Sequence, residues 1–520
     1  MSYLLPKNRF PLILNTKVIA GVLGTYTVSK LVYQAFFNPL NVIPGPWWVR
    51  FTSIPYIISL LRGNIVEFMS DLHEKFGPVV RVNPNEVSIT CGSDIKRILS
   101  SYKYEKSKRY SNMNDICEDI FTTRSESYNK MRRKQVAPAF THHGLETVDD
   151  VIMEVGIESL YQKFDEEINR NGGKSTTINY YNTFQNVSTD IIGELALGKS
   201  FNSIKNGGHL IIDYINIAIV MGALRTMLPF LIVLYYIVPK VVKLRNKAIK
   251  FTLDAIDERR KQNEENSYKP KRDDILQMYI TAINSTNQKK LSNSELIKEL
   301  VVMIGAGVDT TSTTMTWILH LYMMYPSVYQ KVVKEINDSF PDRSKLIRYQ
   351  EARKKLVYFV ATVYESMRFR SVSGAPTYRM SSGDGVFLKD NTFIPPNTEM
   401  GLFIKGAHMD ENVWNNPKSF NPDRFLGEEG EKLKKEVLAF GAGVRICPGK
   451  NLAWMEIFTI LPNLIRKYEF KLPKDSIFGP QHVDETTGEP ILAKASAYIV
   501  TAPTYPQRDC NIVISHKENV

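Results

Sequence analysis

The sequence predicts a mainly α-helical protein with a minor β-sheet region, preceded by an apolar helix. Most segments from Asp149 onward repeat their apolar residues at helical spacing and carry charged residues on the opposite face. Before that point lie two short runs typical of β-strands, and an apolar region near the start of the chain. With 520 residues, 43% of them hydrophobic, the chain can bury a large core together with a cofactor.

The first apolar region runs from about Pro11 to Phe37 and is interrupted by Asn15, Lys17 and Lys30. A membrane-spanning helix needs about 20 predominantly apolar residues, so the Lys30 amine would have to reach back to the lipid–water interface. No small-residue cleavage site follows the apolar part, which argues against a secretory signal. We expect a membrane-anchor helix here, with an in-plane or a docked helix as the alternatives.

A proline-rich segment, Asn38–Trp48, follows the apolar region and is expected to be stiff, because each proline fixes one backbone angle. It separates the apolar region from the rest of the chain. Residues 1–43 would form the anchor and the hinge, and residues 44–520 would form one large domain.

Two short β-type runs, Val79–Val82 and Val87–Thr90, flank the turn signal Asn83-Pro84-Asn85. They predict a small sheet in the first part of the large domain. A later apolar run, Met227–Val238, is too short to cross a bilayer. It can form either an ordinary buried helix or a second contact with a membrane.

The pair Ser292 and Glu295 has the spacing of a capping box and predicts the start of a long helix. Helical periodicity continues from there until Pro326, where the helix is expected to stop.

Within this helix lies the run Ala306-Gly307-Val308-Asp309-Thr310-Thr311. Ala306 and Thr310 are four residues apart and therefore share one face of the helix. Small residues on that face leave room for a flat cofactor. An acid beside a hydroxyl is a poor choice for helix stability, and functional sites often keep such local irregularities. A threonine-rich helix with an incidental acid is the alternative interpretation.

A lone cysteine lies in the run Phe440-Gly441-Ala442-Gly443-Val444-Arg445-Ile446-Cys447-Pro448-Gly449. The glycines allow tight backbone turns and a close approach to a flat ligand. A proline directly after the cysteine suits the first turn of a helix, and a helical pattern begins at Lys450. A helix N-terminus and a neighbouring Arg445 both favour thiolate over thiol. A thiolate in a dry pocket is a good axial ligand for haem iron.

The overall charge and the cysteine count narrow the class of protein. The four cysteines Cys91, Cys117, Cys447 and Cys510 form no C-x-x-C pair, so neither a zinc site nor a disulfide framework is indicated, which fits a reducing compartment. The formal net charge is +12. No nucleic-acid motif accompanies it, so we expect no nucleic-acid partner. A basic docking face together with membrane attraction, or a plain solvated surface, would account for the charge.

The cysteine run resembles the haem-binding loop Phe-x-x-Gly-x-Arg-x-Cys-x-Gly of the cytochrome P-450 family, and the run around Asp309 resembles that family's central-helix motif. The resemblance implies the cytochrome P-450 fold and a haem b whose axial ligand is the Cys447 thiolate. It places Phe440, Gly441, Arg445 and Gly449 in the cofactor loop. It also implies that Thr310 hydrogen-bonds oxygen at the iron and that Asp309 relays protons to it.

Two further motifs match this family. Glu365-Ser366-Met367-Arg368 resembles its E-x-x-R helix, and Arg424 in Phe420-Asn421-Pro422-Asp423-Arg424-Phe425 resembles the arginine that joins it. The resemblance implies a buried network of Glu365, Arg368 and Arg424 that locks the fold around the haem.

The resemblance also indicates which cations hold the haem propionates. Arg445 and Arg379 match the family's cysteine-loop and strand arginines, and Arg133 matches a helix arginine. The tryptophan that often precedes that helix arginine is replaced here by Asn129, and Arg132 could take the role of Arg133.

The resemblance to a fungal microsomal member implies a monooxygenase that inserts one oxygen atom of O₂ into a lipophilic substrate. The substrate classes that fit are steroids, terpenoids, fatty acids and xenobiotics. Electrons would come from NADPH through NADPH-cytochrome P-450 reductase, with cytochrome b5 as an optional donor. The catalytic domain would face the cytosol at the endoplasmic reticulum membrane.

Seven basic residues near the cysteine side would form a docking face for the reductase or only a solvated rim: Lys130, Arg132, Lys134, Lys432, Lys434, Lys435 and Lys450. A reductase-independent isomerase, dehydratase or peroxygenase is one alternative function. A non-enzymatic haem-binding sensor is another.

Overall fold

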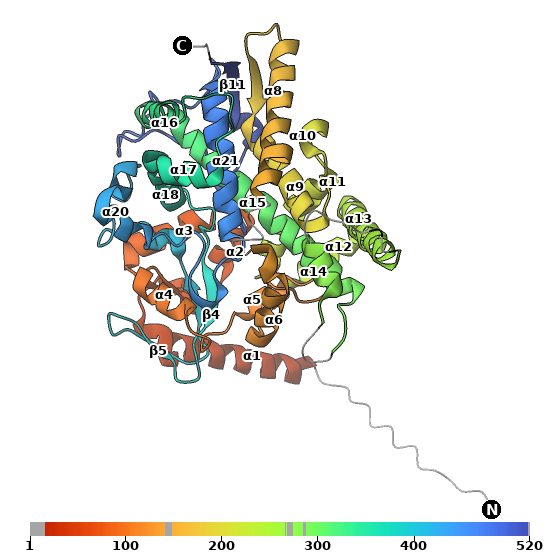
Figure 1. The fold of residues 1–520 in the computed structure, drawn as a ribbon. Helices are drawn as coiled ribbons and strands as arrows, with labels where there is room; N and C mark the ends of the chain where they lie inside the picture. Colours follow the sequence, from red (N-terminus) through yellow and green to blue (C-terminus); the bar gives the residue numbers. More distant parts are fainter. Residues whose placement is uncertain (1–15, 141–147, 266, 268–273, 284–287, 518–520) are drawn as a thin grey trace, which may run out of the picture.

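Most of the protein is helical (Figure 1). The computed structural model describes residues 16–140, 148–265, 267, 274–283 and 288–517. The α-helices are α1 (Thr16–Val32), α2 (Ile54–Leu61), α3 (Ile65–Phe76), α4 (Gly92–Leu99), α5 (Lys108–Asn112), α6 (Glu126–Val136), α8 (Ser159–Arg170), α9 (Tyr180–Leu197), α10 (Ser203–Asn206), α11 (Leu210–Arg225), α12 (Leu234–Ile237), α13 (Pro239–Glu264), α14 (Ile275–Thr281), α15 (Asn293–Met324), α16 (Pro326–Ser339), α17 (Tyr349–Lys355), α18 (Val357–Phe369), α19 (Ile404–Ala407), α20 (Gly427–Lys434), α21 (Lys450–Lys467) and α22 (Pro506–Asp509).

The strands are short, and within the described ranges they form four small sheets. They are β1 (Val79–Asn83), β2 (Glu86–Ile89), β3 (Thr176–Asn179), β4 (Thr377–Met380), β5 (Val386–Phe387), β6 (Phe393–Ile394), β7 (Glu399–Leu402), β8 (Tyr468–Lys471), β9 (Ala495–Ala497), β10 (Thr501–Pro503) and β11 (Asn511–His516). The prediction of a mainly helical chain with a minor sheet region is confirmed.

Helix α15 runs through the middle of the helical body (Figure 1). The Ser292 side chain accepts from the Glu295 backbone N–H and the Glu295 carboxylate accepts from the Ser292 backbone N–H, so the predicted capping box is present. The helix ends at Met324, just before Pro326. It packs against α9, α18 and α21, and these helices share the largest apolar core. Burial on several sides explains why the pattern of this helix is apolar over most of its circumference.

The predicted strand pair forms β1 and β2, which pair antiparallel with Val79 opposite Ile89. They belong to a four-stranded sheet of order β1-β2-β7-β4, in which β2 and β7 are parallel. A second sheet has the order β3-β11-β8. Figure 1 shows β4 and β11 at opposite ends of the molecule, so the helical body lies between the two sheets.

The predicted network around Glu365 is confirmed. The Glu365 carboxylate accepts two hydrogen bonds of 2.7 Å from Arg368, and its Oε1 lies 3.2 Å from Arg424 Nε. Glu365 and Arg368 are fully buried. Because losing one partner would leave a buried charge uncompensated, breaking this network is expected to cost about 3–5 kcal/mol.

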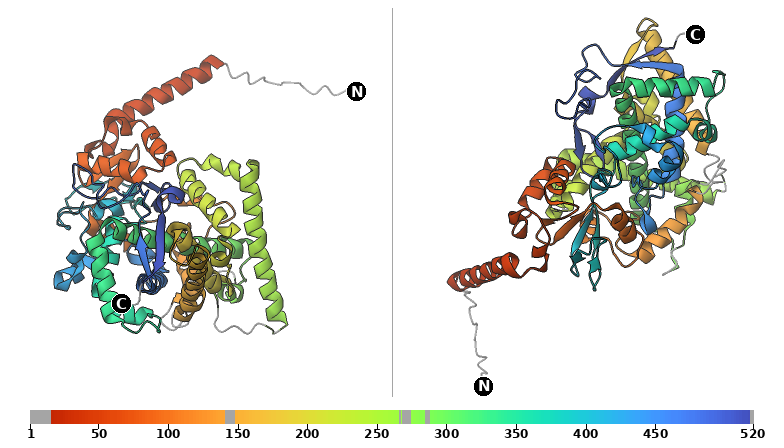
Figure 2. Two further views of the ribbon diagram at one scale, coloured as in Figure 1. Left: turned by 90° about the horizontal axis from the view of Figure 1, so that it is seen from above. Right: turned by 90° about the vertical axis from the view of Figure 1, so that its left-hand side faces the viewer.

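Helix α1 extends away from the body (Figure 2), and many of its apolar side chains are exposed. It is 17 residues long and includes Lys30. In the described part of the chain, no helix combines the length and the apolar character that crossing a bilayer requires. The prediction of a membrane-spanning anchor is therefore not supported. Residues 1–15, which include the start of the predicted anchor, lie outside the described residues.

The apolar run Met227–Val238 forms two short helices, the 3₁₀-helix η6 (Pro229–Val233) and α12. Phe230, Tyr236 and Ile237 are each about 60% exposed or more, at 66%, 59% and 62%. The interpretation of this run as one buried helix is wrong. Pro229 begins η6 and Pro239 begins α13, so prolines bound the helical part of the run at both ends.

Candidate active site

The cysteine loop turns tightly and delivers Cys447 to the start of α21. Gly441 and Gly443 have φ of 69° and 64°, a region that favours glycine. A Cβ on Gly443 would lie 2.3 Å from the Leu99 carbonyl oxygen, so the loop also packs closely on the end of α4. The Cys447 N–H donates to the Phe440 carbonyl at 3.0 Å, which closes the loop. Helix α21 begins at Lys450, as the sequence pattern indicates, with Gly449 as its N-cap. Pro448 therefore lies before the helix and not in its first turn.

The Cys447 thiol has surroundings that oppose and favour its ionisation. Burial raises the pKa of the thiol, whereas hydrogen bonds from the Gly449 and Lys450 backbone and the positive charges of Arg133 and Lys450 lower it. Cys447 is nonetheless exposed. The thiol therefore opens onto a space instead of packing into the core, and a metal bound there would deprotonate it.

One face of α15 also opens onto space. Ala306 is exposed although it lies in the middle of a helix that is otherwise largely buried, and Thr310, one turn later, is half-buried. The Thr310 hydroxyl donates to the Ala306 carbonyl at 2.8 Å. This back-bond is the local irregularity that threonine introduces into a helix. Ala306 and Thr310 thus share an open face, as their spacing predicts.

Asp309 points in another direction from Thr310. Asp309 is 5% exposed, and its Oδ1 accepts a hydrogen bond of 3.1 Å from the Gln185 side chain of α9. Burial raises the pKa of Asp309 to about 6, and the Gln185 hydrogen bond lowers the pKa in opposition. A carboxyl with a pKa near 6 can both accept and donate a proton near neutral pH.

Arg445 and Arg379 lie among buried groups. The Arg445 side chain is 5% exposed, and its Nε donates to Glu126 at 2.8 Å. Its Nη1 is buried and has no hydrogen-bond partner among the described residues. Arg379 is 3% exposed, and its Nη1 donates to the Tyr378 carbonyl at 2.9 Å. Burial lowers the pKa of Arg379, and the positive charge of Arg445 adds to that effect.

Lys106 joins these arginines, and sequence reasoning missed it. The backbone of Lys106 forms an isolated β-bridge with Arg379, and Lys106 is 5% exposed. The amine donates to the Phe121 carbonyl and lies 4.2 Å from the centre of the Tyr110 ring. Burial lowers the pKa of Lys106 well below its ordinary value, and the charges of Arg379 and Arg445 lower it further. In the sequence Lys106 stands in the charged run Glu105-Lys106-Ser107-Lys108-Arg109, which gives no sign that it is buried beside Arg379 and Arg445.

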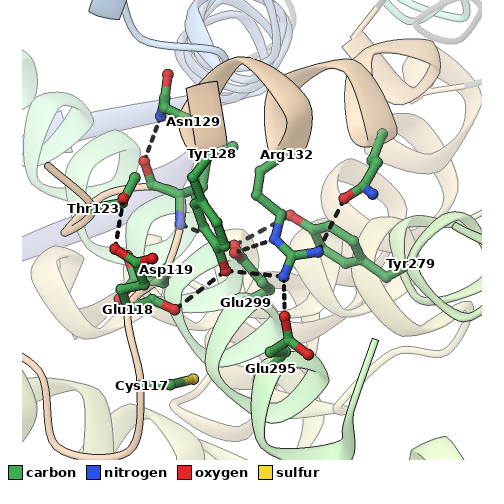
Figure 3. A network of polar contacts seen from close by, with 12 residues as sticks. Cys117, Glu118, Asp119, Thr123, Tyr128, Asn129, Arg132, Tyr279, Glu295 and Glu299 are labelled. Atoms are coloured by element: carbon green, nitrogen blue, oxygen red, sulfur yellow. Dashed lines mark hydrogen bonds and ion pairs between the residues drawn. The ribbon is translucent and has the colours of Figure 1, made fainter. Parts of the chain in front are cut away.

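Arg133 and Arg132, neighbours on α6, have different partners. Arg133 Nη1 donates to the Ile446 carbonyl at 2.8 Å, directly before Cys447. Arg132 is fully buried and pairs with Glu295 and Glu299 at the start of α15 (Figure 3). It also donates to the Tyr128 hydroxyl at 2.9 Å. Arg132 therefore belongs to an acidic network and is not a surface residue of the predicted basic face.

Asn129, at the position of the family's tryptophan, also lies in the surroundings shown in Figure 3. It is buried, and its side-chain amide donates to the Ile120 carbonyl at 2.7 Å. In this chain the residue holds the loop before α6 by a hydrogen bond.

These groups fit a haem. A buried surplus of cations, with an unpartnered Arg445 N–H, matches an anionic ligand, and haem carries two carboxylates. Cys447 supplies one sulfur ligand beside an open space. In the described part of the chain, no group of three or more His, Cys, Asp or Glu residues could hold a bare metal ion.

Comparison with known proteins agrees with this geometry. The family model described as Cytochrome P450 matches residues 43–492. The chain is 32% identical to the cytochrome P450 monooxygenase helB1 of Aspergillus fumigatus, over 97% of this chain and 87% of the relative. It is also 32% identical to helB2 of the same organism, over 94% and 97%. The cytochrome P450 monooxygenase FUS8 of Gibberella fujikuroi is 27% identical over 88% of each chain.

Proposed function

Because this chain belongs to the cytochrome P450 family of haem-thiolate monooxygenases, we propose that it hydroxylates a lipophilic small molecule. In this reaction one atom of O₂ enters a C–H bond of the substrate. The other atom leaves as water, with two electrons from NADPH and two protons. The observation that carries the proposal is the cysteine loop, which presents the Cys447 sulfur at the N-terminus of α21 beside open space.

Cys447 would hold the haem iron, and four cations would hold the haem carboxylates or orient the loop. When bound, a haem with a thiolate ligand supplies the oxygen-activating chemistry. Arg445 and Arg379 offer buried guanidinium groups, and Lys106 adds a buried amine on which both of their charges act. Arg133 supports the site from the other side, because it fixes the Ile446 carbonyl beside the ligand. Phe440, Gly441 and Gly449 would shape the loop that receives the haem.

On the α15 side, Thr310 and Asp309 would handle protons. The open face at Ala306 leaves room for a flat ring and a substrate. The Thr310 hydroxyl can leave its back-bond to Ala306 and donate toward the reacting oxygen. Asp309 Oδ1 or Oδ2 would accept a proton from the solvent side and return it toward Thr310, which its pKa near 6 permits.

A separate NADPH-cytochrome P450 reductase would supply the electrons, with cytochrome b5 as an optional donor. Lys130 and Lys134 are exposed on α6, which also carries Arg133. On α20, Lys432 and Lys434 pair with Glu429 and Glu431 at 2.5 Å, so these two lysines present less free charge. Lys435, the C-cap residue of α20, is exposed, so the docking face for an acidic reductase would depend mainly on Lys130, Lys134 and Lys435.

Residues 1–43 would attach the protein to the endoplasmic reticulum membrane as an anchor and hinge, and the catalytic domain, 44–520, would face the cytosol. Support comes from exposed apolar side chains on α1 and on the segments Trp47–Leu61 and Phe230–Ile237. An apolar surface of this kind favours a lipid interface. It would also favour steroids, terpenoids, fatty acids or other lipophilic substrates taken from the lipid.

The first test addresses the ligand. Cys447→Ser should abolish the thiolate-type Soret band of the reduced, carbon monoxide-bound protein, because a neutral hydroxyl is a poor substitute for a thiolate. Cys117→Ser, at a partly accessible cysteine outside the loop, is the matched control and should keep the band. An unchanged band in Cys447→Ser would refute the ligand assignment.

The second test addresses the substrate class. The haem-loaded protein is titrated with steroids, fatty acids and terpenoids while the Soret band is followed. A saturable low-to-high spin shift with one class identifies the compounds to assay for NADPH-dependent hydroxylation. Turnover that needs NADPH and reductase supports the monooxygenase proposal. Turnover without them would contradict it.

A further inference from the structure

A polar cavity lies on the side of α15 that carries Asp309. Its volume is about 920 Å³, and its walls come from α9, α11, the loop before α11, and the chain around β9 and β10. Side-chain amides dominate the polar part of its lining, including Asn182, Gln185, Asn186 and Asn216. Among the described residues, Asp309 is the one member of α15 that lines it. The cavity has room for many water molecules, since one needs only about 10–15 Å³.

Gln185 lines the same cavity and contacts Asp309 there. Its Nε2 donates to Asp309 Oδ1 at 3.1 Å and to the Tyr181 hydroxyl at 3.1 Å, and it lies 3.5 Å from Asn216 Oδ1. Gln185 is itself buried, at 4% exposure. These contacts fix the amide from two helices, α9 and α11, so the amide can hold the carboxyl in one orientation.

Asp309 and Thr310 are neighbours in sequence, but successive residues point about 100° apart around a helix. Thr310 shares the open face with Ala306, whereas Asp309 lines the polar cavity. The carboxyl therefore has water available on its own side and the hydroxyl of Thr310 on the next face. The hydrogen bond from Gln185 to Asp309 Oδ1 fixes the direction in which this carboxyl faces.

We propose that Gln185 is a positioning residue that holds Asp309 toward the polar cavity and sets how readily the carboxyl exchanges its proton. This inference rests on the proposed function, in which Asp309 relays protons, and adds the residue that controls it. Gln185 favours the ionised form of Asp309, because an N–H donor stabilises a carboxylate. Without Gln185, Asp309 would remain protonated to higher pH and would lose its fixed orientation.

In the described part of the chain, the other titratable side chains that line this cavity are those of Arg62, Tyr181, His209, Asp213 and Tyr498. Tyr181 of α9 lies beside Asp309, and the negative charge of Asp309 adds to burial in raising the pKa of Tyr181. Burial lowers the pKa of His209, and the charge of Asp190 opposes this. Burial and Gln185 account for the shift of Asp309 itself.

The test is an infrared titration of the full-length haem-loaded protein. The Asp309 carboxyl C=O band is assigned as the band that Asp309→Asn removes. Its midpoint should lie near pH 6 in the unmodified protein. Gln185→Leu, which keeps a buried side chain of similar size, should raise the midpoint by about one to two pH units, the contribution of one hydrogen bond to a charge. Gln185→Glu should raise it as well, since a second acid disfavours ionisation.

The matched control is Asn182→Ala. Asn182 lies one turn earlier on α9 and lines the same cavity, and its amide bonds to Gln507 instead of Asp309. The titration midpoint of Asp309 in this variant should stay near that of the unmodified protein. An unchanged midpoint in Gln185→Leu, or an equal shift in Asn182→Ala, would overturn the positioning role.

A separate readout keeps the two proposals apart. NADPH-driven hydrogen peroxide release is measured with a ligand that shifts the Soret band. Gln185→Leu should increase this release several-fold. If Asp309→Asn leaves peroxide release unchanged, the proton-relay function of Asp309 fails, while the infrared titration still decides whether Gln185 positions Asp309.

Discussion

The Thr310 hydroxyl has two possible acceptors, the Ala306 carbonyl of its own helix and the reacting oxygen of the proposed reaction. This hydroxyl donates to the Ala306 carbonyl in the resting protein. Thr310→Ala should therefore leave the helix intact and divert most NADPH electrons from product to hydrogen peroxide. The measurement is product formed and peroxide released per NADPH consumed.

The control for this change is Thr314→Ala, one turn further along α15. The Thr314 hydroxyl makes the same kind of bond, to the Thr310 carbonyl at 2.8 Å. Its loss should leave the ratio of product to NADPH unchanged. Full coupling in Thr310→Ala would refute a role for the hydroxyl.

Lys106 should matter for haem retention and not for the stability of the haem-free protein. It is buried beside Arg379 and Arg445, so an anionic partner compensates a charge cluster that is otherwise repulsive. Lys106→Met should speed haem transfer to apomyoglobin by about tenfold to a hundredfold, since a hydrogen bond to a charge contributes about 1.5–3 kcal/mol. The free energy of unfolding of the haem-free protein should stay equal or increase.

Lys108→Met, at an exposed lysine on α5, provides the comparison and should change neither quantity. Equal haem-transfer rates in Lys106→Met and the unmodified protein would exclude Lys106 from haem binding.

The residue scale shows what the sequence could and could not reveal. The run Phe440–Gly449 carries its geometry locally, because the glycines and Pro448 act within ten residues. Lys106 could not be found this way, since its meaning depends on Arg379, which is distant in sequence and joined to it by a β-bridge. Arg132 was assigned to a surface for the same reason: its acids, Glu295 and Glu299, lie on another helix.

At the scale of elements, α9 and α21 enclose a carboxylic acid that has no cation beside it among the described residues. Glu456 of α21 is buried, and its Oε2 accepts a hydrogen bond of 2.9 Å from Ser188 of α9. Burial raises the pKa of Glu456 from its ordinary value of 4.5 to about 8. Folding therefore takes up a proton between these pH values.

The stability that this proton uptake contributes is complete below about pH 4.5 and is lost as the pH rises through about 8. Through this group the free energy of unfolding changes by at most about 1.4 kcal/mol per pH unit. Glu456→Gln should remove that part of the decline, so the free energy of unfolding, measured by urea titration between pH 5 and 8, should fall less steeply with pH.

Ser188→Ala tests the direction of the effect. The Ser188 hydroxyl lowers the pKa of Glu456, so its removal should extend the decline in stability to higher pH. Identical slopes for Glu456→Gln and the unmodified protein would contradict a buried, protonated Glu456.

Elements were predictable where their ends carry strong local signals. Ser292, Glu295 and Pro326 bound α15, and the turn Asn83-Pro84-Asn85 separates β1 from β2. The run Met227–Val238 allows two predictions, because an apolar segment has the same sequence pattern whether it faces a core or a lipid surface. Only the positions of its neighbours distinguish the two.

At the scale of the whole molecule, apolar groups from distant segments gather around α11. Helix α2 and η6 both pack against α11. Ile58 and Leu61 of α2, and Phe230 and Val233 of η6, are exposed. Lys240 and Lys243 follow at the start of α13, where they would attract anionic lipid. We name Ile58, Leu61, Phe230, Val233, Tyr236 and Ile237 the lipid face.

Replacing Phe230 and Ile237 of the lipid face by serine should reduce co-flotation with phosphatidylcholine–phosphatidylserine vesicles several-fold, because exposed apolar area drives such binding. Val357→Ser, at an exposed valine that begins α18, should have no effect. Binding that persists in the double variant would mean that the lipid face is not the membrane contact.

The strand order β3-β11-β8 has a consequence for how the protein is made. Residues Asn179 and Asn511, which pair across β3 and β11, are 332 positions apart. Helix α9 begins directly after β3, yet on a ribosome β3 emerges long before its partner is translated. The N-terminal end of α9, the helix that carries Gln185, can therefore be held by the β3–β11 pairing only after β11 has been synthesised. A nascent chain stalled ahead of β11 would present this region to chaperones and proteases in an unfinished form.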